Sequence, residues 1–226
     1  MLTAEQIDKN RLEFISLIRQ INIPGADIEG LLNWLDNSDF YYAPASAQYH
    51  NSFDGGLCAH SLNVYKQLVN LVYINQSIIP TYDNNSLLVV GLLHDLSKTN
   101  FYETYTVNKK KYYQGGTKKD NLGNFDWYSE QAFKIKDASE RFLGGTHEFN
   151  SMMLVNKYIP LNYEESMSIL HHHFGMSDKN PPADLSAVAN KYPLVTLLHL
   201  ADMSATYLNE RISSSEPQPQ IIQGKF

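Results

Sequence analysis

The chain has 226 residues, enough for one domain with a substantial core, and 43% of them are hydrophobic, as in ordinary globular proteins. Its net charge of −6 argues against an extended nucleic-acid footprint but is compatible with a nucleotide or a short single strand. No apolar run approaches bilayer length, no signal-peptide pattern is present, and the single Cys58 excludes an internal disulfide. We therefore expect a cytoplasmic protein with no membrane partner.

Helical patterns dominate the first 95 residues. Residues 3–6 form a capping-box pattern ahead of an apolar stripe that Pro24-Gly25 should end. A polar loop over 40–53 precedes Gly55-Gly56, and Asn84-Asn85 can cap a later helix. Three more helices are expected, over about 27–37, 55–75 and 84–95.

The hydrophobic period changes at Tyr102. Residues 102–107 and 110–113 are rich in β-forming side chains around a polar turn at Asn108-Lys109, which predicts a β-hairpin. We interpret the block over about 102–142 as an insertion on a helical scaffold. After it, helices are expected over 147–158, 163–173 and 193–209, and the Ser-, Pro- and Gln-rich residues 213–226 are expected to form a mobile tail.

Several histidines and aspartates lie in unexpectedly apolar surroundings. His94 and Asp95 fall within the run 89–98, where burying an unsatisfied polar group costs on the order of 2–7 kcal/mol. A divalent metal removes this conflict, because it turns both side chains into ligands. Comparable candidates elsewhere in the chain are His60, His147, His171, His172, His173 and Asp202.

The order of these residues resembles that of the HD-domain superfamily of metal-dependent phosphohydrolases, over residues 49–207. The exoribonuclease-type HD domain is the most similar, because its H-x-x-F-x-G-G-L-x-x-H segment matches residues 50–60. The HD-x-x-K continuation matches His94-Asp95-Leu96-Ser97-Lys98. The resemblance implies an all-α HD-domain helical bundle with a small β-hairpin-containing insertion, as a single domain over residues 1–212.

The resemblance also implies a ligand set for two divalent ions, which could be Mn, Fe, Ni, Co, Zn or Mg. In the family the aspartate of the HD pair bridges both ions, a role that falls on Asp95. The I-L-x-H-H-G pattern favours His172 and His173, but the additional Phe174 leaves the choice among the three consecutive histidines open. The implied metal ligands are His60, His94, Asp95, His147, His172, His173 and Asp202.

Asp95 and Lys98 are the expected catalytic residues, and the expected substrate contacts are His50, Lys98, Lys109 and Tyr112. Each substrate contact has a simpler alternative. Lys98 can be a solvated lysine and His50 an ordinary loop residue. The Lys- and Tyr-rich hairpin can grip a nucleotide, although a solvated strand edge is the favoured interpretation.

The expected function is phosphodiester hydrolysis of a small oligonucleotide or cyclic nucleotide. One alternative is an HD-type nucleotidase that hydrolyses (deoxy)nucleoside mono- or triphosphates, and another is a catalytically silent metal-binding scaffold. The expected partner is a nucleotide or a short nucleic acid, and the sequence carries no signal for the oligomeric state.

Overall fold

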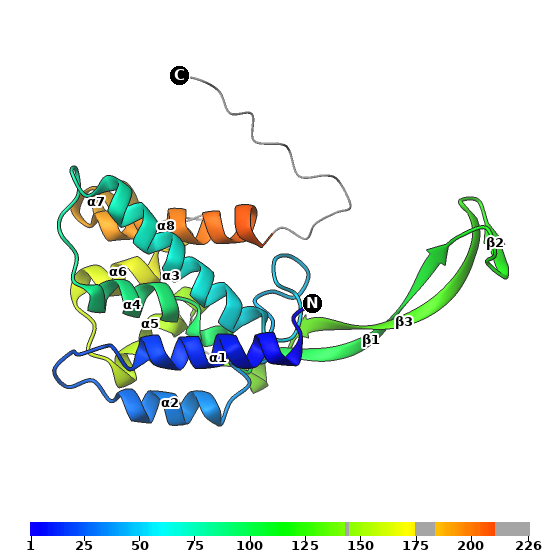
Figure 1. Ribbon diagram of the computed structural model, residues 1–226, viewed down its shortest axis with the longest axis horizontal. Coiled ribbons are helices and arrows are strands. Elements are labelled where there is room, and N and C mark those ends of the chain that lie inside the picture. The colour runs from blue at the N-terminus through cyan, green and yellow to red at the C-terminus, as the bar shows by residue number, and fades with distance from the viewer. Residues whose placement is uncertain (143–144, 175–183, 211–226) are drawn as a thin grey trace, which may run out of the picture.

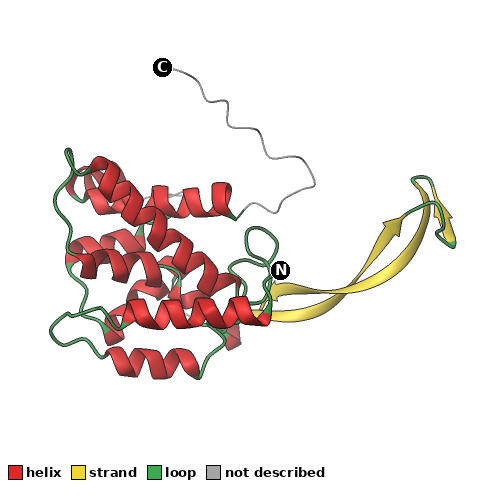
Figure 2. Ribbon diagram, viewed as in Figure 1, coloured by secondary structure: helices red, strands yellow, loops and turns green. Residues whose placement is uncertain are grey.

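Helices form a layered body from which a β arm projects (Figures 1 and 2). A computed structural model of the protein describes residues 1–142, 145–174 and 184–210, so the tail expected over 213–226 lies outside the described residues. The α-helices are α1 (Ala4–Ile18), α2 (Ile28–Asp36), α3 (Gly56–Asn75), α4 (Asn84–Leu93), α5 (His147–Tyr158), α6 (Tyr163–Leu170), α7 (Leu185–Lys191) and α8 (Pro193–Ser204). None of the described helices is long and apolar enough to cross a membrane.

The centre of the body is α4, which packs against α1, α3 and α6. Its residues from Leu87 to Leu93 are all buried, as expected of a helix that is apolar on every side. Because α4 ends inside the core, it delivers His94 and Asp95 to the interior. The apolar run that surrounds the HD pair is therefore the central helix of the body.

Most helix boundaries follow the sequence patterns. Thr3 and Gln6 form the expected capping box of α1, and α5 covers the expected residues 147–158. The sixth helix is shorter than expected, because α6 ends at Leu170 and the consecutive histidines follow it as a turn. The last helix changes from α to a π turn over Ala205–Asn209.

The arm is one long antiparallel ribbon. Strand β1 (Tyr102–Tyr112) pairs with β3 (Gly123–Ile135) along its whole length, and the short β2 (Lys118–Asp120) pairs with the start of β3. The predicted turn at Asn108-Lys109 is wrong, since β1 runs straight through both residues. Neither residue is a glycine, and the chain reverses farther on, at Asn121-Leu122 between β2 and β3.

The expectation of an all-α bundle with a small hairpin is also wrong. The chain has a mixed fold, in which a three-stranded sheet with strands of 11 and 13 residues accompanies the helices. The error has a physical cause. The glycines and polar residues before Gly123 are typical of a loop. The residues after Gly123 pair with the extended strand β1, and this pairing stabilises them as a strand.

Candidate metal centre

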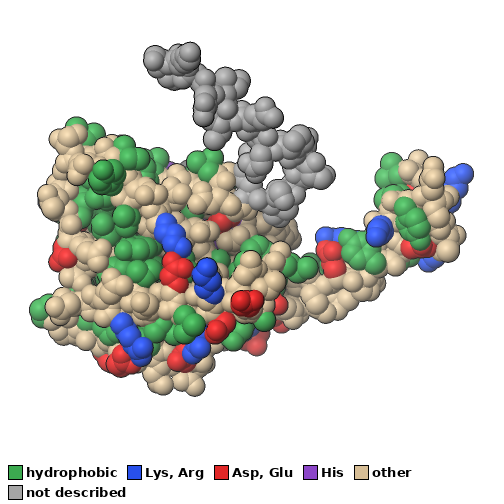
Figure 3. Space-filling model, in the orientation of Figure 1, with side chains coloured by type: hydrophobic (Ala, Val, Ile, Leu, Met, Phe, Trp, Pro, Cys, Tyr) green, Lys and Arg blue, Asp and Glu red, His purple; other side chains and the backbone are tan. Residues whose placement is uncertain are grey.

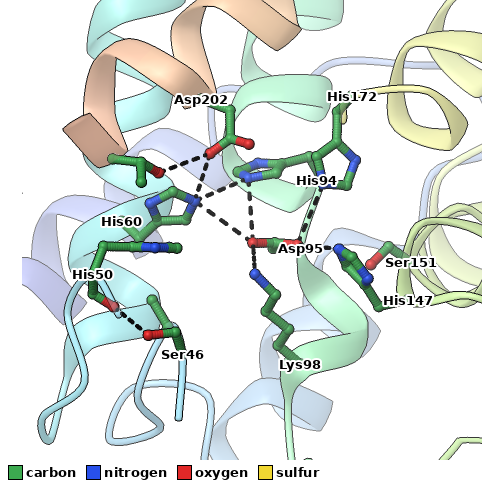
Figure 4. Close-up of polar contacts among 12 residues, drawn as sticks. Ser46, His50, His60, His94, Asp95, Lys98, His147, Ser151, His172 and Asp202 are labelled. Carbon is green, nitrogen blue, oxygen red and sulfur yellow. Dashed lines mark hydrogen bonds and ion pairs between the residues drawn. The ribbon is translucent and has the colours of Figure 1, made fainter. Parts of the chain in front are cut away.

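The seven side chains expected to bind metal converge in the interior of the body, and Figure 4 labels all of them except His173. Five helices contribute to the cluster, through residues within a helix or at its end. The positions are His60 in α3, His94 and Asp95 after α4, His147 at the start of α5, His172 and His173 after α6, and Asp202 in α8.

Asp95 lies between two pairs of imidazoles. Its Oδ2 is 3.6 Å from Nε2 of both His60 and His94. Its Oδ1 is 3.5 Å from Nε2 of both His147 and His172. These separations are too long for good hydrogen bonds, so the carboxylate faces four nitrogens without being bonded closely to any of them.

Two ligand sets can be distinguished around this carboxylate. The first ligand set is His60, His94 and Asp202, in which His60 Nε2 lies 3.3 Å from His94 Nε2 and 3.2 Å from Asp202 Oδ1. The second ligand set is His147, His172 and His173, whose ligand atoms lie within 4.8 Å of one another. Asp95 lies between the two sets, with Oδ2 directed at the first and Oδ1 at the second.

The spacing of these atoms fits coordination of a shared ion. Ligands about 2.1 Å from a metal lie roughly 3.0–3.4 Å from one another in octahedral or tetrahedral geometry. The shortest separations in the first ligand set fall in this range. In addition, Asp95 Oδ1, His147 Nε2 and His172 Nε2 are buried and have no hydrogen-bond partner among the described residues. Buried polar atoms are normally satisfied, and a divalent cation would satisfy all three.

Backbone carbonyls orient two of the imidazoles. His94 Nδ1 lies 3.1 Å from the Gly91 carbonyl oxygen, and His172 Nδ1 lies 2.7 Å from that of Ile169. Both histidines follow the end of a helix, where the last carbonyls have no partner within the helix. Donation from Nδ1 leaves Nε2 unprotonated, which is the form that binds a metal.

Two buried glutamates orient the other three imidazoles, and sequence reasoning missed both. Glu148 Oε1 accepts a hydrogen bond from His173 Nδ1 at 2.7 Å, and its Oε2 lies 3.3 Å from His147 Nδ1. Each carboxylate oxygen of Glu210 lies 3.1 Å from His60 Nδ1. Glu148 follows a predicted ligand directly, so its position next to His147 was a usable signal.

The π turn explains why Glu210 gave no such signal. In a regular α-helix, residue 210 would lie about 80° around the axis from Asp202, because each residue advances about 100°. The wider turn over Ala205–Asn209 reduces that rotation and brings Glu210 to the side of the helix that faces His60. Asn63 Nδ2 then donates to Glu210 Oε1 at 3.0 Å and fixes the carboxylate.

Glu210→Gln is expected to lower the affinity for Mn²⁺ by about 10- to 100-fold, because loss of a charged partner weakens the orientation and basicity of a metal-binding imidazole. Competition with a chelating dye measures this affinity. Gln67→Ala is the matched control, since it removes only a surface contact with Asn209 from the same end of the last helix. Equal affinities of Glu210→Gln and the parent protein would refute the orienting role.

Lys98 supplies the counter-charge of the cluster. Its Nζ donates to Asp95 Oδ2 at 2.6 Å, and both side chains are buried. Burial alone would raise the pKa of Asp95, but the neighbouring Lys98 and His94 hold it well below its usual value. Lys98 is therefore buried, and the alternative interpretation of a solvated lysine is wrong.

His50 lies at the edge of the cluster, with its ring centroid 4.9 Å from that of His60 (Figure 4). Its Nε2 is buried and finds no hydrogen-bond partner in the described part of the chain, and burial lowers the pKa of His50 to about 4. The loop that carries His50 packs closely on α3, because a Cβ on Gly56 would lie 2.0 Å from the carbonyl oxygen of Asn51. The Gly55-Gly56 pair thus permits His50 to lie next to a metal-ligand candidate.

Three of the residues considered from the sequence lie away from the cluster. Lys109 and Tyr112 are on the arm, where Lys109 pairs with Glu130 and the Tyr112 hydroxyl donates to Asp120. His171 is the C-cap residue of α6 and is only partly buried. Of the three consecutive histidines, it is therefore the last two that reach the cluster.

The electrostatics of the cluster predict a stability optimum for the metal-free protein. Burial by itself would lower the pKa of His60, but hydrogen bonds to Asp202 and Glu210 outweigh it and raise that pKa to about 10. Burial lowers the pKa of both His94 and His147 to about 3. In the unfolded chain, each of these histidines titrates near pH 6.5.

The metal-free protein should therefore be most stable near pH 6.5. Above this pH, His60 keeps its proton only when folded, so rising pH favours unfolding until about pH 10. Below it, His94 and His147 take up protons only when unfolded, so falling pH also favours unfolding. Each effect amounts to at most about 1.4 kcal/mol per proton and pH unit. Thermal unfolding with a chelator across this range tests the prediction. The alkaline decline should be smaller in His60→Gln, where the raised pKa of His172 beside Asp95 sustains the remainder.

No family model, curated protein or solved structure matches the chain.

Proposed function

We propose that the chain is an HD-type, binuclear metal-dependent phosphohydrolase that cleaves phosphodiester bonds in nucleotide substrates. One observation carries the proposal. A single buried carboxylate, Asp95, presents each of its oxygens to a different pair of imidazole nitrogens at 3.5–3.6 Å. A carboxylate bridging two ions requires this arrangement, whereas a structural hydrogen-bond network would close the gaps to normal bond lengths.

In this proposal the first ligand set and Asp95 would hold one ion, and the second ligand set and Asp95 would hold the other. The donors are imidazoles and carboxylates without a thiolate, a combination that suits Mn, Fe, Co, Ni or Zn. A structural zinc site more often recruits thiolates, and the single Cys58 is buried in the apolar core. Two divalent ions would supply Lewis-acid activation of water and charge neutralisation of a phosphoryl group.

The chain's own residues would prepare the site for an anionic substrate. Lys98 holds Asp95 in place and adds a positive charge among the ligands. His50 offers a ring nitrogen that makes no hydrogen bond to the described residues, so it can hydrogen-bond to a substrate oxygen. Glu148 and Glu210 keep the imidazole rings in position while the substrate binds.

Hydrolysis of bis-p-nitrophenyl phosphate by the Mn²⁺-loaded protein tests the proposal. Turnover of the diester, with little turnover of p-nitrophenyl phosphate or of nucleoside mono- and triphosphates, is the expected result. Preferential turnover of the monoesters or triphosphates would instead identify a nucleotidase. Bound metal without turnover of any phosphoester would contradict the proposal and indicate a scaffold.

A further inference from the structure

The β arm extends far from the metal centre. Strand β1 starts beside the site, where the Tyr102 hydroxyl donates to the Ala45 carbonyl in the loop that carries His50. From there to Tyr112 the strand spans about 33 Å, at roughly 3.3 Å per residue. Figure 1 shows this ribbon projecting away from the helices. A free mononucleotide in the metal centre is too short to contact the end of the arm.

The distal arm comprises residues 109–128, and both of its acidic residues make contacts within the arm. Asp120 accepts hydrogen bonds from Lys110 Nζ at 2.6 Å and from the Tyr112 hydroxyl at 2.9 Å. Asp126 accepts one from the Thr117 amide at 3.0 Å and another from the Tyr113 hydroxyl. Lys110 therefore balances the charge of Asp120, whereas Asp126 is held by neutral donors and keeps its charge.

Three lysines of the distal arm keep their charge available. Within the described residues, Lys111, Lys118 and Lys119 have no carboxylate within ion-pair distance, unlike Lys109 and Lys110. The distal arm contains five lysines and two aspartates, although the chain as a whole carries a charge of −6. The accessible charge at this end is therefore opposite in sign to that of the whole protein.

Exposed aromatic rings accompany these lysines. Tyr112, Tyr113, Trp127 and Tyr128 are 41%, 47%, 50% and 42% exposed. The tyrosine hydroxyls bonded to Asp120 and Asp126 hold two of the rings in fixed orientations. Figure 3 shows hydrophobic and basic side chains gathered at this end of the arm. Pre-oriented rings lose little conformational freedom when a flat group stacks on them.

We infer that the distal arm binds a single-stranded nucleic acid whose end reaches the metal centre. The inference rests on the proposed function and specifies its substrate as a strand several nucleotides long. Lysines follow a phosphate backbone, and aromatic rings stack on bases with little regard to sequence. The distance between the arm and the metal centre then selects strands over free nucleotides.

The test measures binding of fluorescein-labelled dT20 to the full-length, metal-free protein by fluorescence anisotropy. The triple variant Lys111→Ser, Lys118→Ser, Lys119→Ser should bind at least about tenfold more weakly at low salt. Its plot of log affinity against log salt should be less steep by about 2, because each lost phosphate contact removes roughly 0.7 from the slope. The control with the same loss of charge is Lys9→Ser, Lys66→Ser, Lys157→Ser, on the helical body.

Trp127→Ala tests the stacking component separately. It should weaken dT20 binding by about fivefold or more and leave the salt slope unchanged, because it removes a ring and no charge. Trp127→Phe retains an aromatic ring and should recover most of the affinity. Equal affinity of Trp127→Ala and the parent protein would contradict base stacking on this ring.

Strand binding by the arm and hydrolysis at the metal centre are tested by different measurements. Asp95→Asn should bind dT20 like the parent protein and fail to hydrolyse bis-p-nitrophenyl phosphate. The triple lysine variant should bind dT20 weakly and hydrolyse bis-p-nitrophenyl phosphate like the parent protein. If the triple variant binds dT20 with unchanged affinity and salt slope, the arm inference is overturned. If sedimentation velocity also shows that it loses a dimer which the parent forms, the arm binds a second copy of the chain instead.

Discussion

Asp95→Asn is expected to abolish hydrolysis and to remove bound metal. The substitution keeps the size of the side chain but removes the charge that both ligand sets share. Because loss of an outer hydrogen-bond partner alone costs 10- to 100-fold in metalloproteins, loss of the bridging ligand should cost at least about 1000-fold in kcat/KM. Elemental analysis should show less metal per chain, and unchanged metal content would refute the bridging role.

Asp95→Asn should also lower the free energy of unfolding, an effect that is separate from the loss of metal. Asp95→Asn leaves the buried Lys98 without its carboxylate, and removal of one partner of a buried ion pair costs roughly 3–5 kcal/mol. The double variant Asp95→Asn, Lys98→Met removes both charges and should regain part of that free energy of unfolding. It should remain inactive and metal-poor. Asp36→Asn, in a surface ion pair with Arg11, is the control for loss of a carboxylate charge.

His172→Ala is expected to remove most of the activity, while its neighbour His171→Ala should change activity by less than about twofold. His172 is fully buried and directs Nε2 at Asp95 Oδ1, so its loss opens the second ligand set. His171 is the C-cap residue of α6 and belongs to neither ligand set. For His172→Ala we expect a loss of at least about 100-fold in kcat/KM, together with reduced Mn²⁺ affinity.

The two alanine variants provide matched controls for each other, because they change the same residue type at adjacent positions. Both should be compared by steady-state kinetics and by metal titration. The opposite order of effects would mean that the chain positions its histidines one residue out of register with the proposed cluster. Rescue of His172→Ala by added imidazole would further support a ligand role.

The helical body and the metal cluster could be anticipated because their signals are local in sequence. An apolar run with an embedded His-Asp pair predicts a buried helix and a charged group that needs a partner, and α4 has both features. The conflict between burial and charge at His60 and Asp202 is equally visible in the sequence. These residues are far apart along the chain, but each one indicated the same kind of site.

The arm and Glu210 could not be anticipated in the same way, because both depend on distant partners. The long β1 forms against β3, whose sequence signal follows a glycine-rich segment typical of a loop. Glu210 reaches His60 only because a π turn changes the rotation of the last helix. The expected substrate contacts Lys109 and Tyr112 likewise lie on an arm whose length was underestimated.

Anomalous scattering from crystals of the Mn²⁺-loaded protein tests the binuclear site most directly. We predict two anomalous peaks about 3.5–4 Å apart, one on each side of Asp95. One peak should contact His60, His94 and Asp202, and the other should contact His147, His172 and His173. A single peak, or peaks that do not share Asp95, would contradict the proposed metal centre.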